Sequence, residues 1–216
     1  MSHPIEEDFT ATLWFEQFFS DDIIQLIVNE SISYAKFRGN HHFTADSDEI
    51  RGFLAVLILS GYVPHPRRRM YWEQAADFHS AVAAYFMTRN RFEEVMRNLH
   101  LADNNNLNKE DKVAKVRPLF DILNRSFLAR FCPEAHLSID ESMVPYFGHH
   151  GCKQYIRVKP IRFGYKIWCL NTTLGYLVQF QPYQGKGSVT HSEFGLGGSV
   201  VLDLINNLPV GVQSLL

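Results

Sequence analysis

The stretch that decides the fold is His136-Leu137-Ser138-Ile139-Asp140-Glu141-Ser142-Met143. Apolar and polar side chains alternate in its Leu-Ser-Ile portion, which is typical of a β-strand. We predict a short buried strand here, with the carboxylate of Asp140 near its end. A strand-borne acid of this kind is one part of what a metal-dependent enzyme acting on a phosphodiester would need.

The segment that follows, residues 149–166, carries cationic side chains with aromatic ones between them. Cationic side chains contact the phosphates of nucleic acids. We therefore predict that DNA binding rests on five residues of this segment: Lys153, Arg157, Lys159, Arg162 and Lys166.

The overall composition indicates a folded globular protein, since 46% of the 216 residues are hydrophobic and 20% are charged. The net charge of −2 does not by itself suggest a nucleic-acid partner. Its distribution is more informative, because only four acidic residues face six Lys or Arg from Leu137 onward. An acidic front half therefore masks a basic back half.

The sequence also indicates the cellular compartment of the protein. The N-terminus lacks a cationic start followed by an apolar run, and the longest apolar run, 53–59, is too short to span a bilayer. The cysteines form no C-x-x-C pair, so we expect reduced thiols in a soluble intracellular protein. They are Cys132, Cys152 and Cys169.

The front half has the periodicity of helices. Ser20 followed by two Asp predicts a helix that runs to about Tyr34. Residues 46–49 begin a second helix, apolar nearly all round and so expected at the centre of a helical core. Further helices are expected over 77–87, after a capping box at Asn90, and from Pro118 to Pro133.

A run of three arginines, Arg67, Arg68 and Arg69, precedes Tyr71 and Trp72. One interpretation is a solvated loop, with Trp72 packed on the helices. The other is a second DNA-binding patch with a stacking aromatic side chain. The sequence leaves both open.

The back half changes to β-type patterns. Residues 165–170 and 176–180 predict two strands joined by a turn, and residues 200–208 predict a helix. Three strands followed by a helix, with an Asp on the first strand, resemble the opening of the ribonuclease-H-like fold. We therefore expect an α+β chain: an all-helical N-terminal region followed by a truncated ribonuclease-H-like α/β domain of three strands and one helix.

Several motifs together resemble the piggyBac transposase-derived family. The run Leu-Ser-Ile-Asp-Glu-Ser-Met-Val-Pro-Tyr-Phe-Gly over 137–148 matches that family, as does the segment 149–168 with its Lys-Pro-Ile-Arg-Phe-Gly core. The resemblance extends through Gly-Leu-Gly-Gly-Ser-Val-Val-Leu-Asp-Leu-Ile at 195–205, and into the helical half at 19–23 and 97–101.

The resemblance implies a domain plan and an activity. The plan is a lead-in over 1–19, a helical dimerisation and DNA-binding region over 20–133, and an incomplete ribonuclease-H-like transposase domain over 134–216. Active members of the family transpose DNA at TTAA sites with Mg²⁺ held by three Asp. The first of these matches Asp140, which makes it the candidate catalytic residue and metal ligand.

The family's second Asp is expected after residue 209, in a Phe-Asp-Asn context, where this chain reads Val-Gly-Val-Gln-Ser-Leu-Leu. Glu141 does not replace it, because neighbouring strand residues point to opposite faces. Asp203 is a candidate only if 200–203 is a strand, and the periodicity favours a helix. We therefore interpret Asp140 as vestigial, with no cofactor held by this chain.

A zinc site at His149, His150 and Cys152 is a further possibility, but their spacing lacks the paired ligands of structural zinc sites. A turn with solvated histidines is the preferred interpretation.

The leading functional hypothesis is a transposase-derived, DNA-associated nuclear protein without transposase activity of its own. The alternatives are a module that pairs with a full-length relative or host partner, an active enzyme, and a truncated product without function. A homodimer is compatible with the first two, and no membrane partner is expected.

Overall fold

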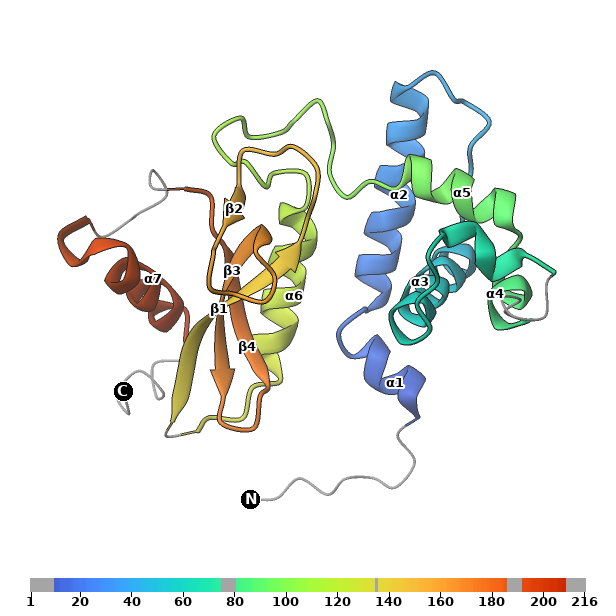
Figure 1. Cartoon of the computed structure of the whole chain (residues 1–216). Helices are drawn as coiled ribbons and strands as arrows, with labels where there is room; N and C mark the ends of the chain where they lie inside the picture. The colour runs from blue at the N-terminus through green and yellow to red at the C-terminus, as the bar shows by residue number, and fades with distance from the viewer. Residues whose placement is uncertain (1–9, 75–80, 135, 186–191, 209–216) are drawn as a thin grey trace. The chain divides into compact units, whose positions relative to one another are not determined.

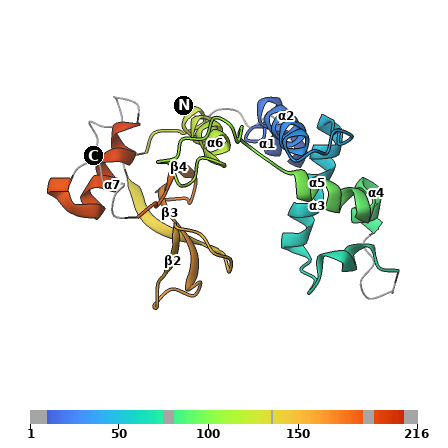
Figure 2. The same cartoon turned by 90° about the horizontal axis from the view of Figure 1, so that it is seen from above.

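A computed structural model describes residues 10–74, 81–134, 136–185 and 192–208. The chain forms two compact units, Met1–Leu107 and Asn108–Leu216 (Figures 1 and 2). The first is helical, and the second combines a small antiparallel sheet with helices, so the expected α+β class is confirmed. None of the helices in the described ranges is long and apolar enough to cross a membrane.

The helical unit agrees with most of the expected helices. Two local expectations differ: the lead-in over 1–19 contains a helix that starts after Thr10, and Thr88, not Asn90, caps the helix at 89. The start of the helix expected over 77–87 lies outside the described residues. The segments are α1 (Ala11–Glu16), α2 (Asp21–Phe37), α3 (Ser47–Tyr62), η1 (Arg68–Trp72), α4 (Ala81–Phe86) and α5 (Arg89–Asn98).

The core of this unit forms where α2, α3 and α5 meet. Ile23 and Ile27 of α2 are buried with Phe53 of α3 and Phe92 of α5, and the two phenylalanine rings lie 4.9 Å apart. Each such side chain contributes about 1.5–3 kcal/mol on burial. α3 contacts α2, α4 and α5, as expected of a helix at the centre of this unit, but only one side of it is buried; Ile58 on the other side is 48% exposed.

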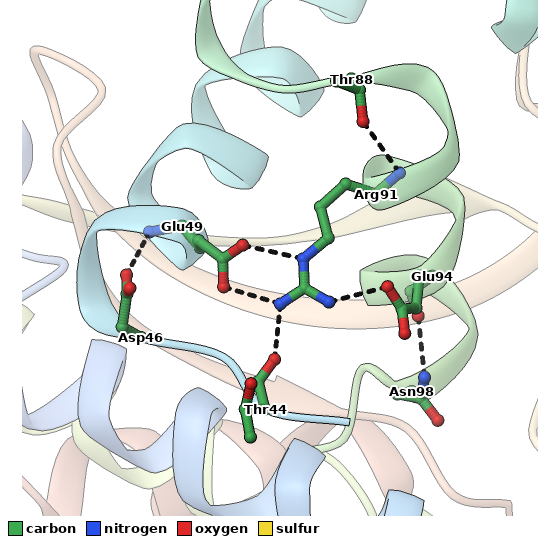
Figure 3. A network of polar contacts seen from close by, with 7 residues as sticks. All are labelled: Thr44, Asp46, Glu49, Thr88, Arg91, Glu94 and Asn98. Atoms are coloured by element: carbon green, nitrogen blue, oxygen red, sulfur yellow. Dashed lines mark hydrogen bonds and ion pairs between the residues drawn. The ribbon is translucent and has the colours of Figure 1, made fainter. Parts of the chain in front are cut away.

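A polar network ties α5 to the start of α3 (Figure 3). The guanidinium of Arg91 donates to both carboxylate oxygens of Glu49, at 2.8 and 2.7 Å, and to Glu94 Oε2 at 2.7 Å. It also donates to the carbonyl of Thr44. These contacts raise the pKa of Arg91, with the hydrogen bond to Glu49 as the largest cause. A single side chain thereby fixes α5 against α3 and the loop before it.

The sheet of the second unit is built around one long strand. β3 (Phe163–Thr172) pairs antiparallel with β1 (Leu137–Pro145) along the whole of β1, from Leu137↔Thr172 to Pro145↔Gly164. On its other side β3 pairs with β2 (Lys153–Tyr155) near its start and with β4 (Leu177–Pro182) near its end. β3 and β4 form the expected hairpin, and Gly175 in its turn has a φ of +86°, which favours glycine.

Two helices flank this sheet (Figures 1 and 2). α6 (Arg117–Ala129) packs on β4, where the Asn124 amide exchanges two hydrogen bonds with the backbone of Phe180, at 2.9 and 3.0 Å. α7 (Gly195–Asn206) follows η3 (Ser192–Phe194) and packs over the other side through Val200 and Leu204.

These elements differ from the expected second domain in two ways. β2 is a fourth strand that its short sequence did not reveal. The unit boundary also falls at 107/108 rather than at 133/134, because α6 buries its aromatic side against the sheet: the rings of Phe120 and Phe180 lie 5.1 Å apart.

Gly164 tests the β1–β3 pairing. A Cβ on this residue would lie 1.9 Å from the carbonyl oxygen of Val144, in the backbone of the paired strand. We expect Gly164→Ala to lower the free energy of unfolding by about 3 kcal/mol, because the backbones must separate. Urea denaturation followed by tryptophan fluorescence measures the change. Gly151→Ala, which would contact nothing, is the control; equal stability of the two variants would contradict this prediction.

Arg91 tests the network of Figure 3. We expect Arg91→Met to destabilise the helical unit by about 2 kcal/mol, because two partly buried carboxylates lose their partner. Thermal unfolding followed by circular dichroism measures the loss. Arg89→Met, on the same helix but exposed, should change stability by less than about 0.5 kcal/mol. A similar effect of both variants would show that the network contributes little.

Candidate nucleic-acid interface

Asp140 lies in the middle of β1 on the face that the strand turns toward solvent. Its side chain is 70% exposed, and the neighbouring side chains on that face, Ser138 and Ser142, are also exposed. Alternation along the strand places Glu141 on the opposite face, as expected. In the register of the sheet, Asp140 is opposite Cys169 of β3.

Lys159, from the turn between β2 and β3, is the charged neighbour of both acids. Its Nζ lies 3.9 Å from Asp140 Oδ1, 3.7 Å from Glu141 Oε1 and 3.4 Å from the Glu141 carbonyl oxygen. These ion pairs are long and partly exposed, so each contributes little to stability. They place the positive charge of Lys159 beside Asp140, whereas a metal-binding site would have further carboxylates there.

The residues around Asp140 do not fit a two-metal site. Such a site needs several carboxylates converging on ions about 4 Å apart. Within the ranges 10–74, 81–134, 136–185 and 192–208, no group of three or more His, Cys, Asp or Glu could hold a metal ion. Asp203 lies on α7, so the helical interpretation of that segment is confirmed.

The basic residues after β1 occupy a hairpin formed by β2 and the start of β3. Lys153 reaches back to the carbonyl of Gly148 at 3.1 Å, and its Nζ lies 5.4 Å from the ring centre of Phe163. Arg157 and Arg162 are exposed near the turn. Together with Lys159, these side chains form a basic rim, which we name the hairpin surface.

Aromatic side chains are part of the same surface. The rings of Tyr155 and Phe163 lie 4.7 Å apart, and both remain about half exposed. The pairing of Tyr155 with Phe163, and of Lys153 with Tyr165, places all four on the sheet face that carries Asp140. Lys153 and two stackable rings thus share one face of the sheet, and a cation beside such rings suits contact with phosphates and bases.

Lys166 does not belong to this surface. It is opposite Met143 in the register, so it points to the other face of the sheet. There its Nζ lies over the indole ring of Trp168, 3.8 Å from the ring centre. The alternation of β3 could have revealed this separation in the sequence once the strand was recognised.

The three arginines at 67–69 belong to the other unit. Arg69 is held by Glu93 through two hydrogen bonds of 2.6 and 3.2 Å, which raise the pKa of its guanidinium. Arg67 and Arg68 are exposed. Trp72 donates its indole N–H to the Met87 carbonyl at 2.8 Å and packs on Phe92, so it serves the helical core.

The histidines at 149 and 150 lie in a turn, and both are exposed. The Nδ1 of His150 accepts a hydrogen bond of 3.2 Å from the backbone of Cys152. Cys152 itself is buried, and burial raises the pKa of its thiol.

The chain matches one family model and several curated human proteins. A family model described as "Transposase IS4" matches residues 10–212. The chain is 52% identical over 195 residues to human PiggyBac transposable element-derived protein 3, covering 89% of the chain and 32% of that protein. It is 52% identical to the human chimeric ERCC6-PGBD3 protein, covering 89% of the chain and 18% of that protein. It is 45% identical to human PiggyBac transposable element-derived protein 2, covering 90% of the chain and 33% of that protein.

A solved structure also matches. A piggyBac transposase in a synaptic complex with hairpin DNA superimposes with a TM-score of 0.78 at 26% identity. The match covers 90% of this chain and 42% of the transposase chain. The chain therefore spans about a third of the two PiggyBac-derived relatives and less than half of the transposase.

Cys169 reports on the position of Asp140. Burial raises the pKa of this thiol, and the charge of Asp140 raises it further. Because a neighbouring negative charge disfavours the thiolate, Asp140→Asn should lower the pKa. We expect the pH profile of Cys169 alkylation by iodoacetamide, measured by peptide mass spectrometry, to shift to lower pH. Glu141→Gln, on the opposite face, should leave the profile in place; a shift in that variant alone would contradict the assigned faces.

Proposed function

The chain belongs to the piggyBac transposase-derived family, and on that premise we propose that it associates with DNA through the hairpin surface. The observation that carries the proposal is the hairpin, which exposes Arg157 and Arg162 near its turn and sets Lys153 beside the half-exposed rings of Tyr155 and Phe163. The similar transposase was solved with hairpin DNA, which supports the same class of partner for this chain.

The chemistry of this surface favours phosphate contacts. Arginine presents a planar fork of donors that matches phosphate oxygens, and lysine adds a point charge. Half-exposed aromatic rings add stacking on unpaired bases, worth about 1–3 kcal/mol per base. Because phosphate contacts release counterions, the affinity should fall steeply as salt rises.

We further propose that this chain binds DNA without cutting it. The support is the environment of Asp140, which has an ammonium group at 3.9 Å and no converging carboxylates among the described residues. Two-metal cleavage of a phosphodiester needs several converging carboxylates, which supports binding without cutting. A nuclear location follows from a DNA-binding role and is part of the same proposal.

A second candidate, a protein-interaction module, is favoured by one observation on the helical unit. Large apolar side chains are exposed along α4 and the end of α3, including Tyr85 at 86% and Tyr62 at 83%. Exposed apolar groups of this size mark protein-binding surfaces when they are contiguous. Light scattering with and without DNA separates the candidates, because a dimer or partner complex would form without nucleic acid.

DNA binding is tested by the salt dependence of affinity. We expect the logarithm of the binding constant for a labelled duplex to fall linearly with the logarithm of salt. The double variant Arg157→Ala/Arg162→Ala should reduce the slope by about two, since each phosphate contact contributes about 0.9. Fluorescence anisotropy between 50 and about 300 mM salt measures the slope.

The control removes two other exposed charges, with Lys109→Ala/Lys115→Ala. Its slope should equal that of the unaltered chain. Equal slopes for all three proteins would place DNA binding away from the hairpin surface, and an affinity independent of salt would contradict phosphate contact altogether.

Strand cleavage is tested directly. We expect incubation with Mg²⁺ and a supercoiled plasmid to leave the DNA intact, as judged by gel electrophoresis. Asp140→Ala should behave like the unaltered chain in this assay. Mg²⁺-dependent nicking that disappears in Asp140→Ala would establish an active enzyme and overturn this part of the proposal.

A further inference from the structure

The loop that follows α5 passes beside α2 (Figure 1), and a small cavity lies between them. Its volume is about 40 Å³. Because a single ordered water needs roughly 10–15 Å³, the cavity has room for a group of a few heavy atoms. The lining comes from α2 and the loop: Glu30, Ser33, Tyr34, Phe37, His100, Ala102, Asp103, Asn104 and Asn105.

The α2 side of the cavity is one face of that helix. Its four lining residues, from Glu30 to Phe37, follow the i, i+3, i+4, i+7 spacing that brings side chains to the same face. Glu30 is partly buried, whereas the Phe37 ring at the end of the helix is 63% exposed. The cavity thus combines a partly buried acid with an exposed apolar ring.

The loop side of the cavity is held against α2 by His100. Its backbone N–H donates to the buried hydroxyl of Ser31 at 3.1 Å, and its ring stacks on Tyr34 with 4.1 Å between the ring centres. Its Nε2 donates to Asn104 Oδ1 at 2.9 Å. A ligand therefore meets a preformed wall, and binding costs little entropy of ordering.

The charges in the cavity are not balanced. Glu30 and Asp103 are its acids, and the described lining contains no lysine or arginine. Asp103 accepts from the Asn105 backbone at 2.9 Å and from the Asn106 amide at 2.6 Å, so both of its oxygens have partners. The Oε2 of Glu30, by contrast, has neither a hydrogen-bond partner nor an ion-pair partner in the described residues, and it is shielded from solvent.

A shielded carboxylate oxygen without a partner destabilises the free protein. Removing a charged group from water costs more than removing a neutral one, unless a counter-charge or hydrogen-bond donors replace the water. The guanidinium of Arg38 does not supply them, because it lies over the ring of Tyr34, 5.8 Å from its centre, and is not part of the lining. A cationic ligand with N–H donors would meet this need at Glu30.

The remaining groups favour the side chain of a lysine. An ammonium group offers three donors on a small head, which suits a carboxylate beside the hydroxyl of Ser33. The stem of a lysine is apolar and packs on exposed rings such as that of Phe37. The amide nitrogen of Asn104 donates to no group in the part of the chain that the structure describes, so it is free to donate to a main-chain carbonyl of the same partner. We propose that this cavity binds the ammonium group of a lysine side chain presented by a partner protein, with Glu30 as its counter-ion.

This proposal goes beyond DNA binding. The partner is a protein, and the site uses none of the residues of the hairpin surface. It also differs from the exposed apolar side chains of α3 and α4, because it recognises its partner by charge. Loss of DNA binding would leave the lysine site standing, and failure of the lysine site would leave DNA binding untouched.

The experiment uses the full chain, isotope-labelled for nuclear magnetic resonance, with the peptide acetyl-Gly-Ser-Lys-Ser-Gly-amide as the probe. We expect the peptide to shift the backbone amide signals of residues 100–105 in a saturable way. A peptide with norleucine in place of lysine keeps the alkyl chain without the ammonium group, so it should bind at least about tenfold more weakly. A trimethyllysine peptide has no N–H donors on its head and should also bind more weakly.

Glu30→Gln tests the counter-ion. The variant keeps the shape of the side chain and removes its charge, so the lysine peptide should bind about tenfold more weakly. Without peptide, the variant should melt no lower than the unaltered chain, because an unpaired charge is lost. Glu73→Gln removes an exposed acid of the same unit outside the cavity and should bind the peptide normally.

Phe37→Ala is a second variant, at an exposed position that should leave the melting temperature unchanged. It should weaken the lysine peptide, because the stem of the lysine loses its apolar contact. Peptide binding equal to that of the unaltered chain would contradict the assigned site.

Each remaining outcome also decides the proposal. Equal binding of the lysine and norleucine peptides would overturn it, as would equal binding of the lysine peptide by Glu30→Gln and the unaltered chain. The absence of a saturable shift at residues 100–105 would overturn it too. Early melting of free Glu30→Gln would show that the carboxylate has a structural partner and is no counter-ion. Spermidine that binds more tightly than the peptide would assign the cavity to free amines and overturn a protein partner.

Discussion

The pairing of β1 with β3 is the constraint on which the second unit depends. Nine consecutive residues of β1 lie opposite β3 in one unbroken register, and this register decides which side chains share a face. Together with the β2 pairing, it places Asp140 on the sheet face of Lys153 and Tyr155, and Lys166 with Trp168 on the reverse side. A slip of one residue would exchange the two sets. The close approach of the Gly164 and Val144 backbones belongs to the observed register, so a glycine at 164 maintains the site as well as the sheet.

Arg91 has a comparable role in the helical unit. Glu49 and Glu94 neutralise its charge, so it orders α3 and α5 without serving as a ligand site itself. The neighbouring Arg38 and Arg97 form no ion pair with a carboxylate in the described residues. A charged cluster therefore divides into a structural member and two accessible ones, and only the three-dimensional contacts show which is which.

The sequence predicted the α+β class, most helices and the β3–β4 hairpin, because these depend on local periodicity and turn residues. It did not predict β2, which is three residues long and is a strand only because β3 lies beside it. The Thr88 cap was missed because Asn90 and Glu93 offered an equally plausible local pattern. The face of Lys166 could have been inferred from the alternation of β3, whereas the neighbours of Arg38 and Arg97 depend on tertiary packing, which no single segment encodes.

Lys159 also affects how the edge of the sheet meets other molecules. In the described residues β1 pairs on one side only, and the Lys159 ammonium lies at 3.4 Å from the Glu141 carbonyl of that strand. A lysine at the edge of a sheet hinders the addition of strands from other molecules, because each added strand would have to desolvate its charge. The position of Lys159 therefore disfavours edge-to-edge association of this sheet. Poor recovery of a Lys159 variant would accordingly report on the solubility of the sheet before it reports on DNA.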